Sequence, residues 1–141
     1  MSVEIDVTYD GDLHCTSVHG PSQQTLITDA PVDNGGKGEA FSPTDLLATA
    51  TATCVLTVMG IVARREGLDI YGTRVHVIKE MVAQPARRIG TLRCTVTIPA
   101  VKVRALSADK RALLEHTARH CPVHQSLHPD IAVPIEFVYE T

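Results

Sequence analysis

The feature that most constrains the fold is the uncharged stretch between Asp45 and Arg64. Ser42 precedes it as a helix N-cap, a proline stands at the first helical position, and Asp45 follows three residues after the cap. Two arginines and Gly67 close it, as is usual at a helix C-terminus. The pattern predicts one long helix within residues 41–67. Because this helix is apolar on every side, it must be covered on every side.

A protein core, a partner subunit or a membrane would provide that cover. The uncharged run of about 18 residues is near the lower limit for a membrane span. Its four threonines and several alanines lower its hydrophobicity, and no aromatic belt flanks it. We therefore expect the buried core helix of a soluble protein, or a helix buried mainly against a partner, and no membrane.

Length and composition narrow the class of protein further. A chain of 141 residues predicts a single domain, residues 1–141, with a core that needs no disulfides. A net charge of −3 argues against a basic nucleic-acid surface, and the absence of tryptophan removes one kind of stacking platform. No basic segment followed by an apolar run opens the chain, which predicts a cytoplasmic protein. We expect no nucleic-acid partner.

The order of the remaining elements predicts an α+β fold. Alternating apolar residues predict strands before and after the long helix, and a glycine-rich loop leads into that helix. A second helix starts at Ser107 as its N-cap. The predicted strands cover residues 2–9, 13–18, 24–28, 68–82, 89–98 and 132–140.

The four cysteines are scattered along the chain. In a reducing compartment such cysteines serve as buried thiols, metal ligands or redox-active groups more often than as disulfides. Cys15 and Cys94 lie in strand patterns, and we assign them packing roles. Cys121 precedes a proline, which predicts a helix N-cap where free N–H groups stabilise a thiolate. Cys54 lies in the middle of the long helix, so it is an inert buried thiol unless another segment supplies a cation or donors.

Histidines surround Cys121. His120 and His124 flank it directly and would add positive charge when protonated. The tract also offers ligands that zinc accepts, and a zinc site is the alternative chemistry. However, a proline interrupts the helical spacing and no second cysteine pair has ligand spacing, so we expect solvated histidines and no metal. The tract comprises His116, His120, Cys121, His124 and His128.

Two cysteine motifs carry a resemblance to a known family. The helix sequence SPTDLLATATATC and the later CPVHQSL resemble the OsmC/Ohr family, the osmotically inducible protein C and organic hydroperoxide resistance group. The likeness extends over nearly the whole chain. It implies an intertwined homodimer in which antiparallel sheets wrap around long buried central helices.

The resemblance also implies thiol-dependent reduction of hydroperoxides. Cys54 would attack the O–O bond as a thiolate and become a sulfenic acid, and Cys121 would condense with it to a disulfide. An external dithiol would then restore both thiols, with no other cofactor. The apolar surroundings of Cys54 suit organic hydroperoxides better than hydrogen peroxide.

The sequence departs from the family pattern where Cys54 would be activated. Family peroxidases use an N-terminal arginine, oriented by a glutamate shortly after the helix-start proline. Here Thr44 and then Asp45 follow that proline, and no arginine precedes Arg64. Lys37 is the only earlier lysine, so Lys37, Thr44 and Asp45 are the candidates for activating or orienting Cys54. The alternative is a dimeric redox sensor or hydrophobic-ligand binder with little turnover.

Overall fold

The computed structural model describes residues 1–141, which divide into two compact units: unit 1, residues 1–47, and unit 2, residues 48–141. The boundary falls within the first turns of the long helix. The elements are β1 (Ile5–Gly11), β2 (His14–His19), β3 (Thr25–Asp29), the 3-10 helix η1 (Val32–Asn34), α1 (Pro43–Arg65), β4 (Arg74–Val82), β5 (Arg88–Ile98), α2 (Ala100–Val103), α3 (Ala108–Ala118), α4 (Pro122–Ser126) and β6 (Ile135–Tyr139).

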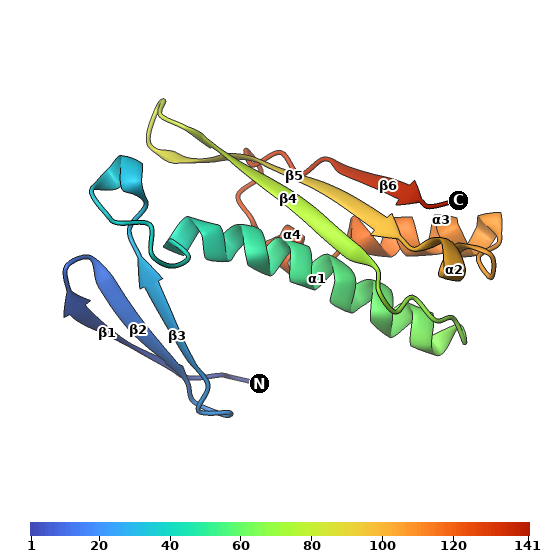
Figure 1. Cartoon of the computed structure of the whole chain (residues 1–141), viewed down its shortest axis with the longest axis horizontal. Helices are drawn as coiled ribbons and strands as arrows, with labels where there is room; N and C mark the ends of the chain where they lie inside the picture. The colour runs from blue at the N-terminus through green and yellow to red at the C-terminus, as the bar shows by residue number, and fades with distance from the viewer. The chain divides into compact units, whose positions relative to one another are not determined.

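Unit 1 is built on a three-stranded antiparallel sheet in the order β1-β2-β3 (Figure 1). Its strands lie within three residues of the predicted bounds. Ile5 and Val7 alternate along β1 on one face of the sheet, as the sequence pattern predicted, and Tyr9 continues that face. These side chains are 59%, 61% and 64% exposed, so this apolar face has no cover within unit 1.

Helix α1 begins and ends where local capping chemistry predicted. The N–H of Asp45 donates to Ser42 Oγ at 3.1 Å, and the N–H of Ser42 donates to Asp45 Oδ2 at 2.9 Å, forming a capping box. At the other end Gly67 has a φ of 68°, which a glycine adopts without strain. The next N–H, of Leu68, donates to Ala63 O at 2.7 Å and completes a Schellman motif.

Unit 2 packs helices against one face of the β4-β5-β6 sheet. Alternate residues of β5 point to the helices, and α1 and α3 lie on that side (Figure 1). Four alternate residues of β5 are all 0% exposed: Leu92, Cys94, Val96 and Ile98. The last three form a core cluster with α1 and α3, whose members include Val55, Met59 and Leu114.

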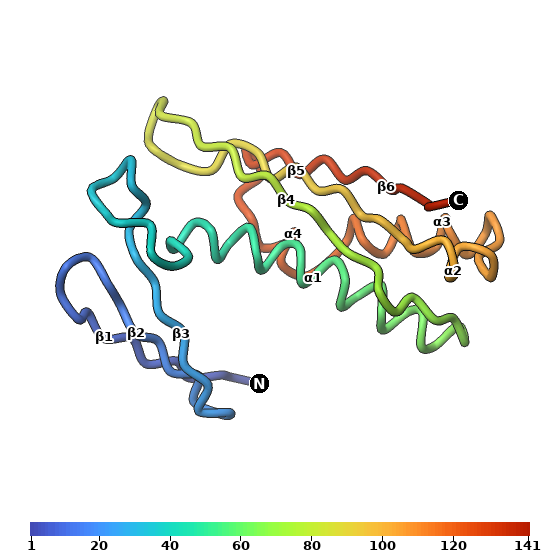
Figure 2. Tube along the Cα trace, viewed as in Figure 1, coloured from blue at the N-terminus to red at the C-terminus, as the bar shows by residue number.

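The pairing of the last strand differs from the prediction. Strand β6 runs parallel to β5, from Cys94↔Ile135 to Ile98↔Tyr139, so this sheet is mixed and the expected purely antiparallel sheets are wrong. A parallel neighbour requires a long crossover connection. Helices α2, α3 and α4 form that crossover and return the chain to the starting end of β5, as Figure 2 traces.

The start of one strand and the presence of one short helix also differ from the sequence prediction. Strand β4 starts at Arg74, six residues later than expected, because a turn precedes it in which Gly72 has a φ of 86° and Thr73 N–H donates to Ile70 O. Leu68 and Ile70 still pack against the core cluster, which explains their apolar character without a strand. Helix α2 was not predicted.

Helix α1 is covered on one side only within the single chain. Its buried residues, among them Val55 and Met59, face the unit 2 core. By length and composition alone α1 also satisfies the criteria for a membrane span. Its burial against the sheet fits a core helix instead. However, Ile61 is 58% exposed, so one chain provides only part of the cover that the sequence requires.

Candidate active site

The two cysteines predicted to react come together in unit 2. Cys54 lies on α1 and is partly buried, whereas Cys121 directly precedes α4 and is fully buried. Cys121 belongs to the apolar core cluster and Cys54 packs against it, and both are free thiols. The Cys54 side chain is a hydrogen-bonding neighbour of the Cys121 thiol, and this contact raises the pKa of Cys121. The fold thus places two thiols, distant in sequence, side by side.

Cys121 is the N-cap of α4, as predicted. Pro122 occupies the first turn, and the N–H of His124 donates to Cys121 Sγ at 3.4 Å. The expected stabilisation of a thiolate does not follow. Burial is the largest influence and raises the pKa of Cys121 above its usual value, while the N–H groups of His124 and Val123 offset only part of that rise. Cys121 is therefore a protonated thiol at neutral pH.

Cys94 is a third thiol beside this pair, and the sequence analysis assigned it only a packing role. It lies on β5, is 0% exposed and belongs to the same core cluster. Burial, with a smaller contribution from the nearby Cys121, raises the pKa of Cys94 to about 11. Its position on the buried face of β5 was visible in the sequence, but its proximity to Cys121 depends on the crossover through α3.

The histidines near Cys121 bond mainly to the backbone. The Nδ1 atoms of His120 and His124 lie 2.7 Å from His116 O and 2.9 Å from Arg119 O, respectively. The contact of His124 with Cys121 is made by its main-chain N–H. The ring centroids of His116 and His120 are 4.3 Å apart.

The ligand atoms of this tract do not gather into a metal site. The one group of three or more histidine, cysteine or acidic side chains with donor atoms within 4.8 Å of one another lies elsewhere, in unit 1.

The residues proposed to activate Cys54 belong to unit 1. Lys37 Nζ lies 3.0 Å from Asp12 Oδ2 in an exposed ion pair. Thr44 Oγ1 lies 3.2 Å from Ser42 Oγ, and Asp45 closes the capping box at the start of α1. Each of the three therefore has a local structural partner, and their part in activating Cys54 stays a prediction.

Comparisons with known proteins agree with the cysteine motifs. The sequence profile of the family described as OsmC-like protein matches residues 36–136. A crystal structure from Psychrobacter arcticus, provisionally named an osmotic stress induced and detoxification response protein, is 46% identical and has a TM-score of 0.86. The alignment covers 94% of this chain and 93% of that one.

More distant structures share the fold. The organic hydroperoxide resistance protein OsmC of Legionella pneumophila is 16% identical with a TM-score of 0.76, over 98% of this chain and 97% of that one. OhrB of Bacillus subtilis, also an organic hydroperoxide resistance protein, is 15% identical with a TM-score of 0.68, over 97% and 98%. No curated protein matches the sequence. The profile match over most of the chain and the 46% identical structure show that this chain belongs to the OsmC-like protein family.

Proposed function

We propose that this protein reduces organic hydroperoxides by a two-cysteine mechanism, in which Cys54 attacks and Cys121 resolves. The observation that carries the proposal is the contact between the two thiols within one apolar cluster. Two cysteines held together by different elements need little rearrangement to form a disulfide.

The Cys54 thiolate attacks the O–O bond of ROOH, which leaves Cys54 as a sulfenic acid and releases the alcohol ROH after protonation of the alkoxide. The Cys121 sulfur then attacks the sulfenic sulfur, loses its proton and releases water as the disulfide forms. An external dithiol reduces that disulfide by exchange and becomes a disulfide itself. The cytoplasm is the compartment that we propose, because it supplies such reductants.

The apolar surroundings support an organic substrate. Cys54 packs against the core cluster, whose neighbouring side chains include Val55, Val58 and Met59. An alkyl or aryl hydroperoxide gains by burying its apolar group there, whereas hydrogen peroxide has no such group. The Legionella and Bacillus relatives are both named organic hydroperoxide resistance proteins, which supports the same substrate class.

We further propose that the protein works as a homodimer. The chain leaves two apolar surfaces uncovered: the face of β1 that carries Ile5, Val7 and Tyr9, and the side of α1 that carries Ile61. Exposed apolar patches of this kind mark association surfaces. Sedimentation should give twice the monomer mass, and Val7→Lys should shift the protein toward monomer. A wild-type protein that sediments as a monomer at micromolar concentration would contradict the dimer.

The second candidate is a redox sensor or hydrophobic-ligand binder with little turnover. The absence of any arginine before Arg64 favours it, and Lys37, the earliest lysine, is already paired with Asp12. A lysine also lacks the bidentate fork of an arginine.

Peroxide consumption by the reduced protein distinguishes the two candidates. The assay uses cumene hydroperoxide with a dithiol reductant and compares wild type, Cys54→Ser and Cys121→Ser, with Cys15→Ser in unit 1 as the matched control. The mechanism requires turnover that is lost in Cys54→Ser and retained in Cys15→Ser. Consumption no faster than by free thiol, unchanged by any of the substitutions, would refute the enzyme and leave the sensor or binder.

A further inference from the structure

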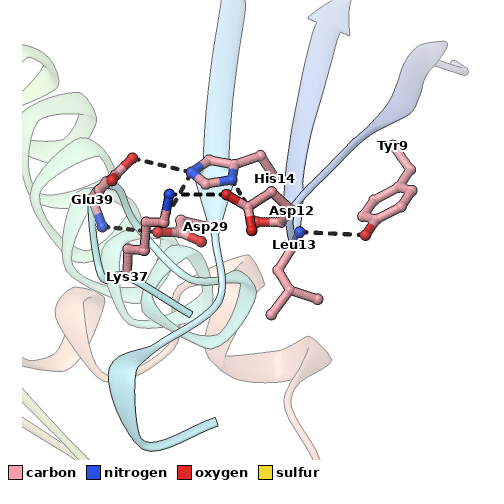
Figure 3. Close-up of polar contacts among 7 residues, drawn as sticks. All are labelled: Tyr9, Asp12, Leu13, His14, Asp29, Lys37 and Glu39. Carbon is pink, nitrogen blue, oxygen red and sulfur yellow. Dashed lines mark hydrogen bonds and ion pairs between the residues drawn. The ribbon is translucent and has the colours of Figure 1, made fainter. Parts of the chain in front are cut away.

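A second cluster of reactive side chains lies in unit 1 (Figure 3). His14 opens β2 and is paired in register with Asp29 at the end of β3, and Glu39 follows in the loop before α1. His14 Nε2 lies 3.5 Å from Asp29 Oδ2 and 3.3 Å from Glu39 Oε2. The strand register and the returning loop thus bring one imidazole and two carboxylates together.

The orientation of His14 leaves its second nitrogen facing negative charge. Nδ1 lies 2.7 Å from the carbonyl oxygen of Asp12, and because a carbonyl only accepts, Nδ1 carries the hydrogen. Nε2 then faces the oxygens of Asp29 and Glu39, which also only accept. A proton or a metal ion must lie between them. A hydrogen bond from the other ring nitrogen to a backbone carbonyl is also the usual support of a metal-ligating histidine.

The carboxylate of Asp29 supplies an independent observation. Its side chain is 0% exposed, and Oδ2 accepts the N–H of Glu39 at 3.0 Å, whereas Oδ1 has no hydrogen-bond partner. Besides that N–H, the main-chain N–H groups of Ala30 and Lys37 and the ring of His14 also act on this carboxylate. A buried carboxylate with an unsatisfied oxygen is costly unless a cation compensates it.

Lys37 lies beside the cluster, where its ammonium group pairs with Asp12 at 3.0 Å and its charge also acts on Glu39 and Asp29 (Figure 3). Within ion-pair distance, the carboxylates of Asp29 and Glu39 contact the imidazole of His14. Two negative charges converging on a nitrogen lone pair match a divalent cation.

We propose that His14, Asp29 and Glu39 bind a divalent metal ion of the zinc class. Zinc accepts imidazole nitrogen and carboxylate oxygen at about 2.0–2.1 Å, which places tetrahedral ligand atoms about 3.3–3.4 Å apart. The distances from Nε2, 3.3 Å and 3.5 Å, fit that geometry. Magnesium and calcium prefer all-oxygen sites, so the imidazole favours zinc or a similar transition metal.

The proposed site has an open position and a structural consequence. Three protein ligands leave a fourth tetrahedral position for water, on the side where Glu39 is exposed. The ion would join β2, β3 and the loop that leads to α1.

An imidazolium ion at His14 is the competing explanation, because a proton on Nε2 would satisfy the same two carboxylates.

Metal titration of the full-length protein tests the proposal. The metal-stripped protein is titrated with Zn²⁺ against a chromophoric chelator, and separately with Co²⁺ to record its ligand-field spectrum. Wild type should bind one ion per chain with a tetrahedral Co²⁺ spectrum. His14→Gln and Glu39→Gln should each weaken binding by at least tenfold, since even outer-shell changes weaken metal affinity about 10–100-fold.

His19→Gln is the matched control, because His19 lies on the same strand and its Nδ1 contacts only Ser22 Oγ, at 2.6 Å. It should bind like wild type. The proposal is overturned if His14→Gln and Glu39→Gln bind like wild type, or if the protein binds no ion and the His14 ring simply titrates, which would establish the imidazolium. A thiolate-to-cobalt charge-transfer band that disappears in Cys54→Ser would also overturn it, by placing the metal at the thiols.

Discussion

Replacing Cys121 with serine tests whether the resolving role is specific to that thiol. In Cys121→Ser the hydroxyl can still accept the N–H of His124, so the start of α4 keeps its cap. Cys94 is then the remaining thiol in unit 2 that is available to a sulfenic acid on Cys54, and it belongs to the same core cluster. The question is whether Cys94 can replace Cys121.

The pKa of Cys94 gives the expected magnitude. Burial raises that pKa from 9.0 to about 11, which lowers the thiolate fraction at neutral pH about 100-fold. A more basic thiolate is intrinsically more nucleophilic, and a Brønsted coefficient near 0.5 recovers about tenfold of the loss. Resolution by Cys94 should therefore be about tenfold slower than by a thiol of ordinary pKa, and slower still if the rigid core prevents its approach.

The assay is dimedone trapping with intact mass spectrometry after one equivalent of cumene hydroperoxide. At pH 7.5 the Cys121→Ser protein should accumulate a trapped sulfenic acid on Cys54, whereas wild type and Cys94→Ser should form the Cys54–Cys121 disulfide. Raising the pH toward 9 should shorten the lifetime of the trapped species if Cys94 does reach it. A Cys54–Cys94 disulfide that forms at pH 7.5 as fast as the wild-type disulfide would refute the reasoning.

Three further predictions concern stability. Ser42→Ala removes the Oγ acceptor of the capping box and should lower the free energy of unfolding, measured in urea, by about 1 kcal/mol. Ser42→Thr should retain most of that stability. Leu114→Ala empties a fully buried position and should cost about 2–5 kcal/mol by the same measurement; a cost below 1 kcal/mol would show that α3 is not packed as described.

The ion pair with Lys110, at 2.6 Å, lowers the pKa of Glu66 below its ordinary value of 4.5, so its stabilisation is present above that pH and is lost as pH falls through the lower folded value. Lys110→Met should therefore reduce stability at pH 7 and leave it unchanged at pH 2; equal losses at both pH values would contradict the pairing.

The parts of the fold that the sequence predicted are those set by local chemistry. The ends of α1 depend on Ser42, Asp45 and Gly67, all within one turn of the positions they cap. The buried face of β5 depends on alternation alone. The parallel pairing of β6 with β5 was missed because it depends on where three helices return the chain, and no local pattern encodes that path.

In the candidate site too, the features set by local chemistry were predicted and those set by tertiary contacts were missed. Cys121 was placed correctly at a helix N-cap, and the N–H groups there do lower its pKa, but burial, which the local argument could not include, raises that pKa more. The cluster of His14, Asp29 and Glu39 was missed altogether. Its members lie far apart in sequence, and only the β2–β3 register brings the first two together.

The uncharged stretch of α1 is the sequence feature behind the proposed homodimer. A helix without charge on any side cannot leave a side in water at low cost. The unit 2 sheet covers the side that carries Val55 and Met59, yet Ile61 remains exposed. Unit 1 independently exposes the β1 face that carries Val7. A two-fold partner brings a second copy of both surfaces, so a single association can cover all four. The same association would bring a second chain to the helix that carries Cys54, where a cation from the partner would have to enter if Lys37 does not supply one.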